Sequence, residues 1–439
     1  MKKYITLSIA LFCGYVLFAQ TPDWVWSNGL IGTDEERSHT IEIDGADNVY
    51  IAGSFSSSSF TIGTNNLTSQ GNHDVFLAKY DSLGNSIWVL SMGGTHEDEA
   101  WDVKPDNQNN IYVTGYFRSP GFNIGSDTTL YNTGAASMFI VKFDSDGNFL
   151  WAQNSSGSGR EWGRALGVDE SDNVYLGGNF VDGDITIADT TLINQGGYDL
   201  FVSKYTPTGD RIWTRHAGAS GTELLRNLTV SPEYRNVYVI GDFTSDSITF
   251  DATTFTNANS GYRDNFVVKY NQDGDVVWAR HIYGTEEEFG SFIAVDWQEN
   301  IYVTGQFKSS TCNFGTFQLS NNSSTKEVYL AMYDPNGNVM WVTGMYGDGE
   351  DLVYSITSDM NDGIYISGWF NSLSFGVGSD IFTSNGGHDS FISKFDYQGN
   401  YYWTKQCGGS TNDYAECVAA DLYGNLYVTG RFASTTLQF

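Results

Sequence analysis

The sequence predicts an all-β fold: a seven-bladed β-propeller of four-stranded antiparallel blades, with an N-terminal strand that closes the last blade. The first observation is a tryptophan that recurs in steps of 62 to 65 residues, at Trp26, Trp88, Trp151, Trp213, Trp278, Trp341 and Trp403. The second is a Tyr-x-x-Gly-x-Phe column of the same period, at Tyr50, Tyr112, Tyr175, Tyr238, Tyr302, Tyr365 and Tyr427. The third is the strand-like composition of the short segments between them, which are rich in β-branched and aromatic residues.

Each repeat unit carries two hairpins. A turn such as Asp81-Ser-Leu-Gly-Asn85 joins a Phe-x-x-Lys-Tyr strand to the tryptophan strand, because Asp bonds back to the backbone and Gly adopts positive φ. A second turn, such as Asp44-Gly-Ala-Asp-Asn48, precedes the Tyr-x-x-Gly strand. The expected single domain spans 20–439, with blades at approximately 38–92, 100–155, 163–217, 225–282, 290–344, 353–407, and 415–439 together with 23–31. The tryptophans are expected to be buried blade residues.

The two ends of the repeat belong to one blade. The first tryptophan strand, 23–31, has no hairpin partner before it, and the last unit stops after the Tyr427 strand. The Phe-x-x-Lys-Tyr strand is therefore present in only six copies, at Phe76, Phe139, Phe201, Phe266, Tyr329 and Phe391. We expect the closing blade to lack one strand, and the gene product to continue past Phe439 with that strand.

Residues 1–19 are typical of a secretory signal peptide. Lys2 and Lys3 precede an apolar run from Tyr4 to Phe18, and cleavage is expected near Ala19. The mature chain is thus expected to be secreted or held at the cell surface, without membrane insertion. The formal net charge of −30 makes nucleic acid a poor partner. An extracellular glycan or an envelope protein is the expected kind of partner, and we expect a monomer.

No catalytic or metal-binding motif is found in the sequence. Cys312, Cys407 and Cys417 lack metal-type spacing, and the six histidines form no His-Glu-x-x-His pattern. The turns that begin at Asp144 and Asn271 are similar to the start of a calcium loop, but no Glu follows at the twelfth position. Asx turns explain them more simply, so we expect no cofactor, and calcium is the one that stays open.

An acidic residue follows the glycine at each crossover between units: Glu36, Asp98, Glu161, Glu223, Glu288, Asp351 and Asp413. These residues could form an anionic ring at the mouth of an axial channel that captures a cation. Alternatively, each carboxylate accepts backbone N–H bonds at the crossover between blades. Two unpaired charges ~8 Å apart repel by about 2 kcal/mol at an effective dielectric of 20, which favours the structural interpretation.

The residue three positions after each acid varies from blade to blade: His39, Trp101, Arg164, Arg226, Ser291, Tyr354 and Glu416. Repeat proteins place specificity in variable columns. We therefore predict a ligand-binding lining at the channel mouth, made by His39, Trp101, Arg164, Arg226 and Tyr354. Strand alternation puts this column on the same side as apolar residues two and four positions further on, such as Ile41 and Ile43.

Two arginines of the variable column, Arg164 and Arg226, fall in adjacent blades. Together they suit a carboxylate or sulfate group. In the alternative interpretation they are structural and form ion pairs with Glu161 and Glu223, since buried arginines are usually paired.

One unit also resembles a named repeat. It runs Asp74-x-Phe76-x-x-Lys79-Tyr80-Asp81-x-x-Gly84-Asn85-x-x-Trp88, then Gly93-Gly94, then Asn110-x-Tyr112-Val-Thr-Gly115-x-Phe117. This pattern resembles the SBBP-type bacterial β-propeller repeat, over essentially all of residues 24–439. The fifth blade departs from it, with Met332 for the lysine and Glu327 for the aspartate. The resemblance implies a secreted or cell-surface protein of Bacteroidetes, without a uniform activity, and a sorting domain after the missing strand.

The sequence therefore predicts an exported, non-enzymatic binding or scaffold propeller whose ligand is unknown. The alternative is a carbohydrate-active or other hydrolytic propeller enzyme with a site at the axial channel mouth. No catalytic residue is assigned in either case.

Overall fold

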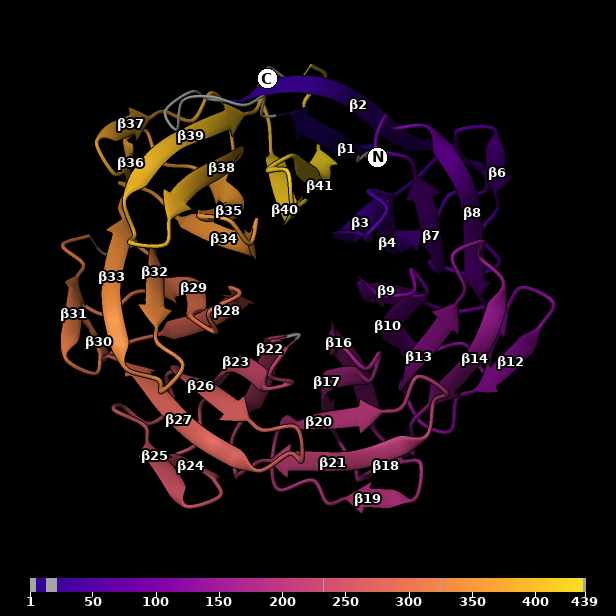
Figure 1. The fold of residues 1–439 in the computed structure, drawn as a ribbon, viewed down its shortest axis with the longest axis horizontal. Helices are drawn as coiled ribbons and strands as arrows, with labels where there is room; N and C mark the ends of the chain where they lie inside the picture. Colours follow the sequence, from indigo (N-terminus) through magenta and orange to yellow (C-terminus); the bar gives the residue numbers. More distant parts are fainter. Residues whose placement is uncertain (1–4, 13–21, 232, 324, 437–439) are drawn as a thin grey trace.

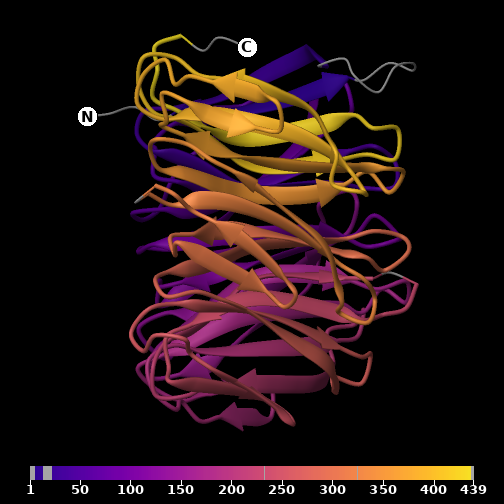
Figure 2. The ribbon, with the colours of Figure 1, turned by 90° about the vertical axis from the view of Figure 1, so that its left-hand side faces the viewer.

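The computed structural model describes residues 5–12, 22–231, 233–323 and 325–436. Over these residues it contains strands and no helix, and the antiparallel sheets follow one another around a central axis as a β-propeller (Figure 1). This confirms the predicted all-β propeller. Figure 2 shows that the first strands, in indigo, and the last strands, in yellow, lie together on one side of the ring.

The strands of each sheet are ordered from the axis outward and are antiparallel throughout (Figure 1). The first run of four strands consists of β3 (Glu36–Ile43), β4 (Val49–Phe55), β7 (Asp74–Tyr80) and β8 (Ser86–Gly93). The second consists of β9 (Asp98–Pro105), β10 (Ile111–Phe117), β13 (Ser137–Phe143) and β14 (Phe149–Asn154). The third consists of β16 (Arg160–Val168), β17 (Val174–Val181), β20 (Asp199–Tyr205) and β21 (Arg211–Ala217). The fourth run consists of β22 (Glu223–Val230), β23 (Val237–Phe243), β26 (Asp264–Tyr270) and β27 (Val276–Tyr283). The fifth consists of β28 (Glu288–Val295), β29 (Ile301–Phe307), β32 (Glu327–Tyr333) and β33 (Val339–Met345). The sixth consists of β34 (Asp351–Ser358), β35 (Gly363–Phe370), β38 (Asp389–Asp396) and β39 (Tyr401–Cys407).

Short hairpins connect the second and third strands of these runs along the chain. They were not predicted from the sequence. They are β5 (Phe60–Ile62) with β6 (Asn65–Leu67), β11 (Gly121–Ile124) with β12 (Thr128–Tyr131), β18 (Ile185–Ile187) with β19 (Thr190–Leu192), β24 (Ser247–Phe250) with β25 (Thr253–Thr256), β30 (Thr311–Phe314) with β31 (Phe317–Ser320), and β36 (Phe375–Val377) with β37 (Asp380–Phe382). Some of them pair with the outermost strand of the preceding sheet, β11 with β8 and β30 with β27. The hairpin strand β18 pairs instead with β15 (Ser156–Gly157), a short strand that follows β14 in the chain. The hairpins therefore tie neighbouring sheets together.

The chain termini share one sheet, in the order β40 (Asp413–Ala420), β41 (Leu426–Phe432), β1 (Ile5–Phe12), β2 (Asp23–Gly32). In the structure β1, which lies within the predicted signal segment 1–19, holds the place of the third strand that was expected to be missing. The physical reason is that any apolar segment of eight residues can satisfy the unpaired N–H and C=O groups of an open edge, whatever its match to the repeat. The predicted cleavage position near Ala19 lies outside the described residues.

The recurring tryptophan connects one sheet to the next. The indole N–H of Trp213 on β21 donates to the backbone oxygen of Gln272, 3.0 Å away in the tight turn between β26 and β27. Trp88 and Trp278 donate in the same way to turn carbonyls one sheet further on. The φ of Gly274 is 83°, and a Cβ at this glycine would meet the Trp213 ring at 2.9 Å, so the turn requires glycine. The tryptophan column is thus structural.

Candidate functional site

Every inner strand contains a β-bulge at the same position of the repeat. The register shifts fall at His39, Trp101, Arg164, Arg226, Ser291, Tyr354 and Glu416, each of which has no partner on the second strand of its sheet. These are the seven residues of the variable column. A bulge leaves the extra residue unpaired and re-aims its side chain, and bulges are frequent next to functional sites.

A cavity of about 770 Å³ lies along the axis and is lined by the inner strands. Its volume is within the range of small-molecule sites. It brings together five members of the variable column: His39, Trp101, Arg164, Arg226 and Glu416. The other two, Ser291 and Tyr354, are not among its lining residues.

Arg164 stacks on an aromatic ring in the neighbouring sheet. Its guanidinium carbon lies 4.1 Å from the centroid of the Trp101 ring, while the Trp101 indole N–H donates to Glu99 over 3.0 Å. No carboxylate lies within 4.0 Å of the Arg164 guanidinium in the described part of the chain. Burial, followed by the charge of Arg226, lowers the pKa of Arg164 to about 10, so this side chain is still a cation at neutral pH.

Arg226 is held by a carboxylate on the next strand of its own sheet. Its Nε lies 2.5 Å from Asp242 on β23, and Arg263 contacts the other oxygen of Asp242 at 2.9 Å. The predicted alternative, in which Arg164 pairs with Glu161 and Arg226 with Glu223, is therefore wrong. The bulge is the physical reason: it directs the arginines to the axis, while both glutamates are buried at the crossovers.

His39 and Glu416 lie at the same end of the cavity. The Glu416 carboxylate pairs with Arg431 over 2.8 Å, and burial raises its pKa to about 7. Burial, followed by the charge of Arg37, lowers the pKa of His39 to about 3. His39 is thus a neutral imidazole at physiological pH, and its Nε2 has no hydrogen-bond partner among the described residues. This end of the cavity therefore presents a neutral imidazole beside the ion pair of Glu416 and Arg431.

A polar ladder that was not predicted from the sequence connects β3 and β9. The Thr40 hydroxyl donates to Asp102 over 3.1 Å, the Leu166 N–H donates to the same carboxylate over 2.7 Å, and Lys104 contacts Glu42. Burial raises the pKa of Asp102 to about 7. The signal was available, since Asp102 and Lys104 are charged where the third sheet has alanine and glycine.

The predicted alternation along the inner strand holds only in part. Ile43 lines the cavity together with His39, whereas Ile41 is fully buried in the apolar core, and Thr40 and Glu42 line the cavity because the bulge at His39 shifts the phase of the strand. Strand alternation holds only as long as each residue has one partner.

The acid column is buried at the crossovers between sheets. All seven carboxylates belong to residues that are at most 1% exposed. Asp98 accepts the Gly94 N–H at 2.8 Å and the Ser119 hydroxyl at 2.7 Å, and Asp413 makes the same two contacts with Gly409 and Ser434. These contacts connect the crossover loop to the end of the second strand, so the acids do not line the cavity as a ring of free anions.

The serine partners form a further column that was missed: Ser57, Ser119, Ser245, Ser309, Ser372 and Ser434, each two residues after a repeat phenylalanine. The third sheet has Asp182 at this position, and Glu161 instead accepts a bond from Ser155 over 3.2 Å. A Phe-x-Ser pattern of the same period was the signal that could have revealed it.

We expect Ser119→Ala to lower the free energy of unfolding by about 1–3 kcal/mol, because it leaves the buried Asp98 carboxylate short of a donor. Denaturant titration measures the loss. Ser126→Ala is the matched control, since Ser126 is exposed in a loop, and should stay within about 0.5 kcal/mol of wild type. Equal stabilities of the two variants would contradict the structural role of the acid and serine columns.

Within the described ranges, no group of three or more His, Cys, Asp or Glu side chains is arranged to hold a metal ion. The Asp144 and Asn271 side chains accept N–H bonds from their own turns, at 2.8 to 3.0 Å, which are the contacts of Asx turns. Cys312 and Cys407 are buried free thiols, and burial raises the pKa of Cys407 to about 12. The same ranges include no helix long and apolar enough to cross a membrane.

No family model matches the chain. The chain is similar to an uncharacterized WD repeat-containing protein of Acanthamoeba polyphaga mimivirus, with 23% identity over 438 residues, 80% of this chain and 32% of that protein. It is also similar to the regulatory protein FlaEY of Caulobacter vibrioides, with 25% identity over 239 residues, 50% of this chain and 24% of that protein. The chain thus spans a third or less of the length of these curated relatives.

Solved structures of similar shape include the WD40 domain of Neurospora crassa Pan2, with a TM-score of 0.44 and 10% identity over 90% of this chain and 88% of that one. A protein of unknown function from Bacteroides caccae has a TM-score of 0.36 and 11% identity over 77% of this chain and 93% of that one. The sequence similarity to a WD-repeat protein agrees with the β-propeller fold described above.

Proposed function

We propose that this chain is an exported, non-enzymatic binding protein whose axial cavity binds an anionic group such as a carboxylate or sulfate. The observation that carries the proposal is the placement of Arg164 and Arg226 on neighbouring bulges, with Arg164 stacked on Trp101 and without a carboxylate partner in the described residues. A guanidinium without a carboxylate partner in the protein can donate two parallel hydrogen bonds to an oxyanion of a ligand.

We also propose that the propeller has seven blades. The runs of strands amount to seven blades, the last of which contains β40, β41 and β2. Cleavage of a signal in residues 1–19 would remove β1 from that blade. Export through a signal in residues 1–19 and an SBBP-type repeat are further parts of it. The ligand we propose is an acidic extracellular glycan, since the mixture of aromatic, cationic and imidazole groups suits a sugar that carries a charged substituent.

Binding accounts for Asp102 and Glu416, two of the seven acidic residues that line the cavity, better than hydrolysis does. A glycoside hydrolase needs a free acid and a second free carboxylate. Asp102 is engaged by the Leu166 N–H and by Thr40, and Glu416 is paired with Arg431. Neither group is left available for proton transfer to a sugar oxygen, which favours a binding role.

The double variant Arg164→Ala with Arg226→Ala should weaken binding of a sulfated or uronic-acid oligosaccharide by at least tenfold, about 1.4 kcal/mol. Titration calorimetry gives the affinity, and a neutral oligosaccharide of the same length gives the background. Binding of the charged probe should also weaken as salt increases.

Arg160→Ala is the matched control for this experiment. Arg160 pairs with Asp182 at the surface, outside the cavity, so its loss should not change the affinity. Arg164→Lys separates charge from geometry, because lysine keeps the charge and loses the planar fork. Wild-type affinity in the folded double variant would overturn the proposed site.

A further inference from the structure

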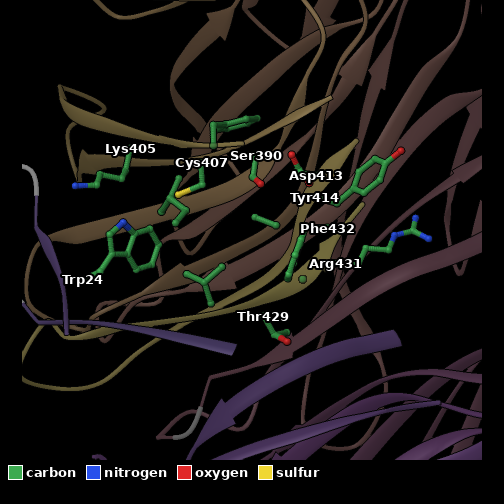
Figure 3. Close-up of a pocket in the computed structure, with 14 residues that line it drawn as sticks. Trp24, Ser390, Lys405, Cys407, Asp413, Tyr414, Thr429, Arg431 and Phe432 are labelled. Atoms are coloured by element: carbon green, nitrogen blue, oxygen red, sulfur yellow. The ribbon is translucent and has the colours of Figure 1, made fainter. Parts of the chain in front are cut away.

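A cavity of about 390 Å³ lies at the rim of the ring, between the fourth and the fifth sheet. It is lined by β25, β27, the β30–β31 turn and the turn between β32 and β33, and these elements lie next to one another on the outside of Figure 1. The volume of this rim cavity is within the range of small-molecule sites. A cavity between the sixth and the closing sheet measures about 40 Å³, which holds a few water molecules (Figure 3). Of these two, only the rim cavity is large enough for an organic ligand.

Three stacked rings form one wall of the rim cavity. The His281 ring lies between the rings of Phe255 and Tyr283, with centroid distances of 5.0 and 4.7 Å and interplanar angles of 17° and 26°. All three residues line the cavity, and Tyr283 is 37% exposed. The imidazole is held in place by Asp264, whose carboxylate lies 3.0 Å from Nε2. The wall is therefore aromatic and fixed in orientation.

This aromatic wall is a departure from the repeat. The third sheet has the same pair of histidine and aspartate, with His216 and Asp199 3.0 Å apart. It has Leu192 and Gly218, however, at the two positions where the fourth sheet has the flanking rings. Repeat proteins keep structural positions uniform and vary those that give specificity. The histidine–aspartate pair is thus structural, and the two added rings indicate a binding site.

The rim cavity also contains a guanidinium group. Arg280 donates to the backbone oxygens of Ala279, Asn336 and Gly337 over 2.6 to 2.8 Å. These bonds use three of the five N–H groups of an arginine and leave two for a ligand. Because backbone oxygens are neutral acceptors, the positive charge of Arg280 is not balanced by these contacts.

The preceding junction between sheets shows what balances such a charge. There Arg215 donates to the turn of the fourth sheet in the same way, and it pairs with Asp275 of that turn over 3.6 Å. The residue at the corresponding position in the fifth sheet is Asn338, which lines the rim cavity. No carboxylate lies within 4.0 Å of the Arg280 guanidinium in the ranges that the structure describes. The cavity therefore opens where the repeat replaces an acid by a neutral amide.

A buried hydroxyl group lines the rim cavity as well. Tyr333 is 1% exposed, and its hydroxyl has no hydrogen-bond partner among the described residues. A buried polar group without a partner costs free energy, and a polar atom of a ligand can supply one.

We propose that the rim cavity binds a small aromatic carboxylate. The ring of the ligand packs against the stacked wall, and its carboxylate accepts the two remaining N–H groups of Arg280. A sugar acid brings the charge without an aromatic ring, and a neutral aromatic compound leaves Arg280 unbalanced. The rim cavity shares no lining residue with the axial cavity, so this proposal does not depend on the proposed function.

The first test is titration calorimetry of the full chain with benzoate. Benzamide, which has the ring without the charge, and glucuronate, which has the charge without the aromatic ring, should each bind at least tenfold more weakly. The double variant Arg164→Ala with Arg226→Ala should bind benzoate as the wild type does, because both arginines belong to the axial cavity. No saturable binding of benzoate, equal binding of benzamide or glucuronate, or loss of benzoate binding in the double variant would overturn the proposal.

Asn338→Asp is the decisive variant, since it gives the fifth sheet the acid that the fourth sheet has at this position. The new carboxylate should pair with Arg280 and weaken benzoate binding at least tenfold. The repeat already contains this aspartate, so we expect the variant to fold. Asn148→Asp is the matched control, because it makes the same change in an equivalent exposed turn that Leu90 contacts in place of an arginine. Wild-type affinity in Asn338→Asp, or an equal loss in Asn148→Asp, would contradict the proposed site.

Tyr283→Ser tests the aromatic wall separately from the charge. The second sheet has Ser156 at this position, so the repeat accommodates serine there. The variant should weaken benzoate binding about fivefold through the loss of ring contacts and leave the weak binding of glucuronate unchanged. Full retention of benzoate affinity would show that the stacked rings do not contact the ligand.

Discussion

Replacing Trp213 by alanine should lower the free energy of unfolding by about 3–5 kcal/mol. Trp213 is 7% exposed, its indole N–H bonds to the Gln272 carbonyl of the next sheet, and its ring lies 5.9 Å from that of Tyr175. The substitution leaves a cavity at a junction between sheets and removes one of the two donors to the Gln272 carbonyl, the other being the Lys204 ammonium at 3.2 Å. Denaturant titration measures the effect.

Trp297 supplies the matched control for this experiment. It is 60% exposed, so Trp297→Ala removes a ring of the same size without opening a core cavity. The control should stay within about 0.5 kcal/mol of wild type. A loss of less than about 1 kcal/mol for Trp213→Ala would mean that the tryptophan column does not hold the sheets together.

The second large effect is a loss of stability as pH rises from 5 to 8. Burial raises the pKa of Glu288 to about 8 and that of Glu36, Glu161 and Asp351 to about 7. In the unfolded chain these carboxyls titrate near pH 4. The folded protein therefore holds more protons between about pH 4.5 and 7, and this stability is lost as pH rises through the folded pKa values.

The expected size of the effect follows from how steeply the free energy of unfolding changes with pH. One extra proton on the folded state corresponds to about 1.4 kcal/mol per pH unit, so melting temperatures should fall by several degrees from pH 5 to pH 8. Below about pH 4 stability should fall again, because N–H donors lower the pKa of Asp81, Asp144 and Asp334. Thermal melts across the pH range measure both the fall in stability above pH 5 and the fall below about pH 4.

Glu288→Gln tests whether the buried acids cause this slope. Glutamine is a neutral replacement of similar shape, so the variant should show a shallower fall between pH 6 and 8. Glu170→Gln changes an exposed glutamate in a turn and should leave the slope unchanged. A stability that rises with pH over this range would contradict the burial of the acid column.

The β-propeller could be predicted from the sequence because the motifs that specify its strands and turns recur in every repeat unit. The tryptophan, the Tyr-x-x-Gly-x-Phe strand and the Asp-x-x-Gly-Asn turn each specify a local geometry, and their period specifies that the geometry recurs. The outer hairpins escaped prediction because strands of three or four residues, such as Phe60–Ile62, carry too little pattern to stand out from a polar loop.

The variable column could be found in the sequence, but the side chains around it could not. Variation singled out Arg164 and Trp101, which lie together in the cavity. The partner of Arg226 was wrongly predicted, because Asp242 comes from the neighbouring strand and only the bulge brings the two together. Asp102 and Lys104 were overlooked for the same reason, since the bulge changes which residues face the axis.

By itself, then, the sequence determined the propeller, its turns and the recurring tryptophans that connect neighbouring sheets, because these depend on short-range patterns that repeat. Only the tertiary structure places Ile5–Phe12 beside β41 and β2, since an apolar segment of this kind is compatible with a secretion signal as well as with a strand. It also decided the ion pairs of the cavity and the burial of the acid column. Those depend on which backbones lie side by side across sheets, and spacing along the chain carries no information about such distances.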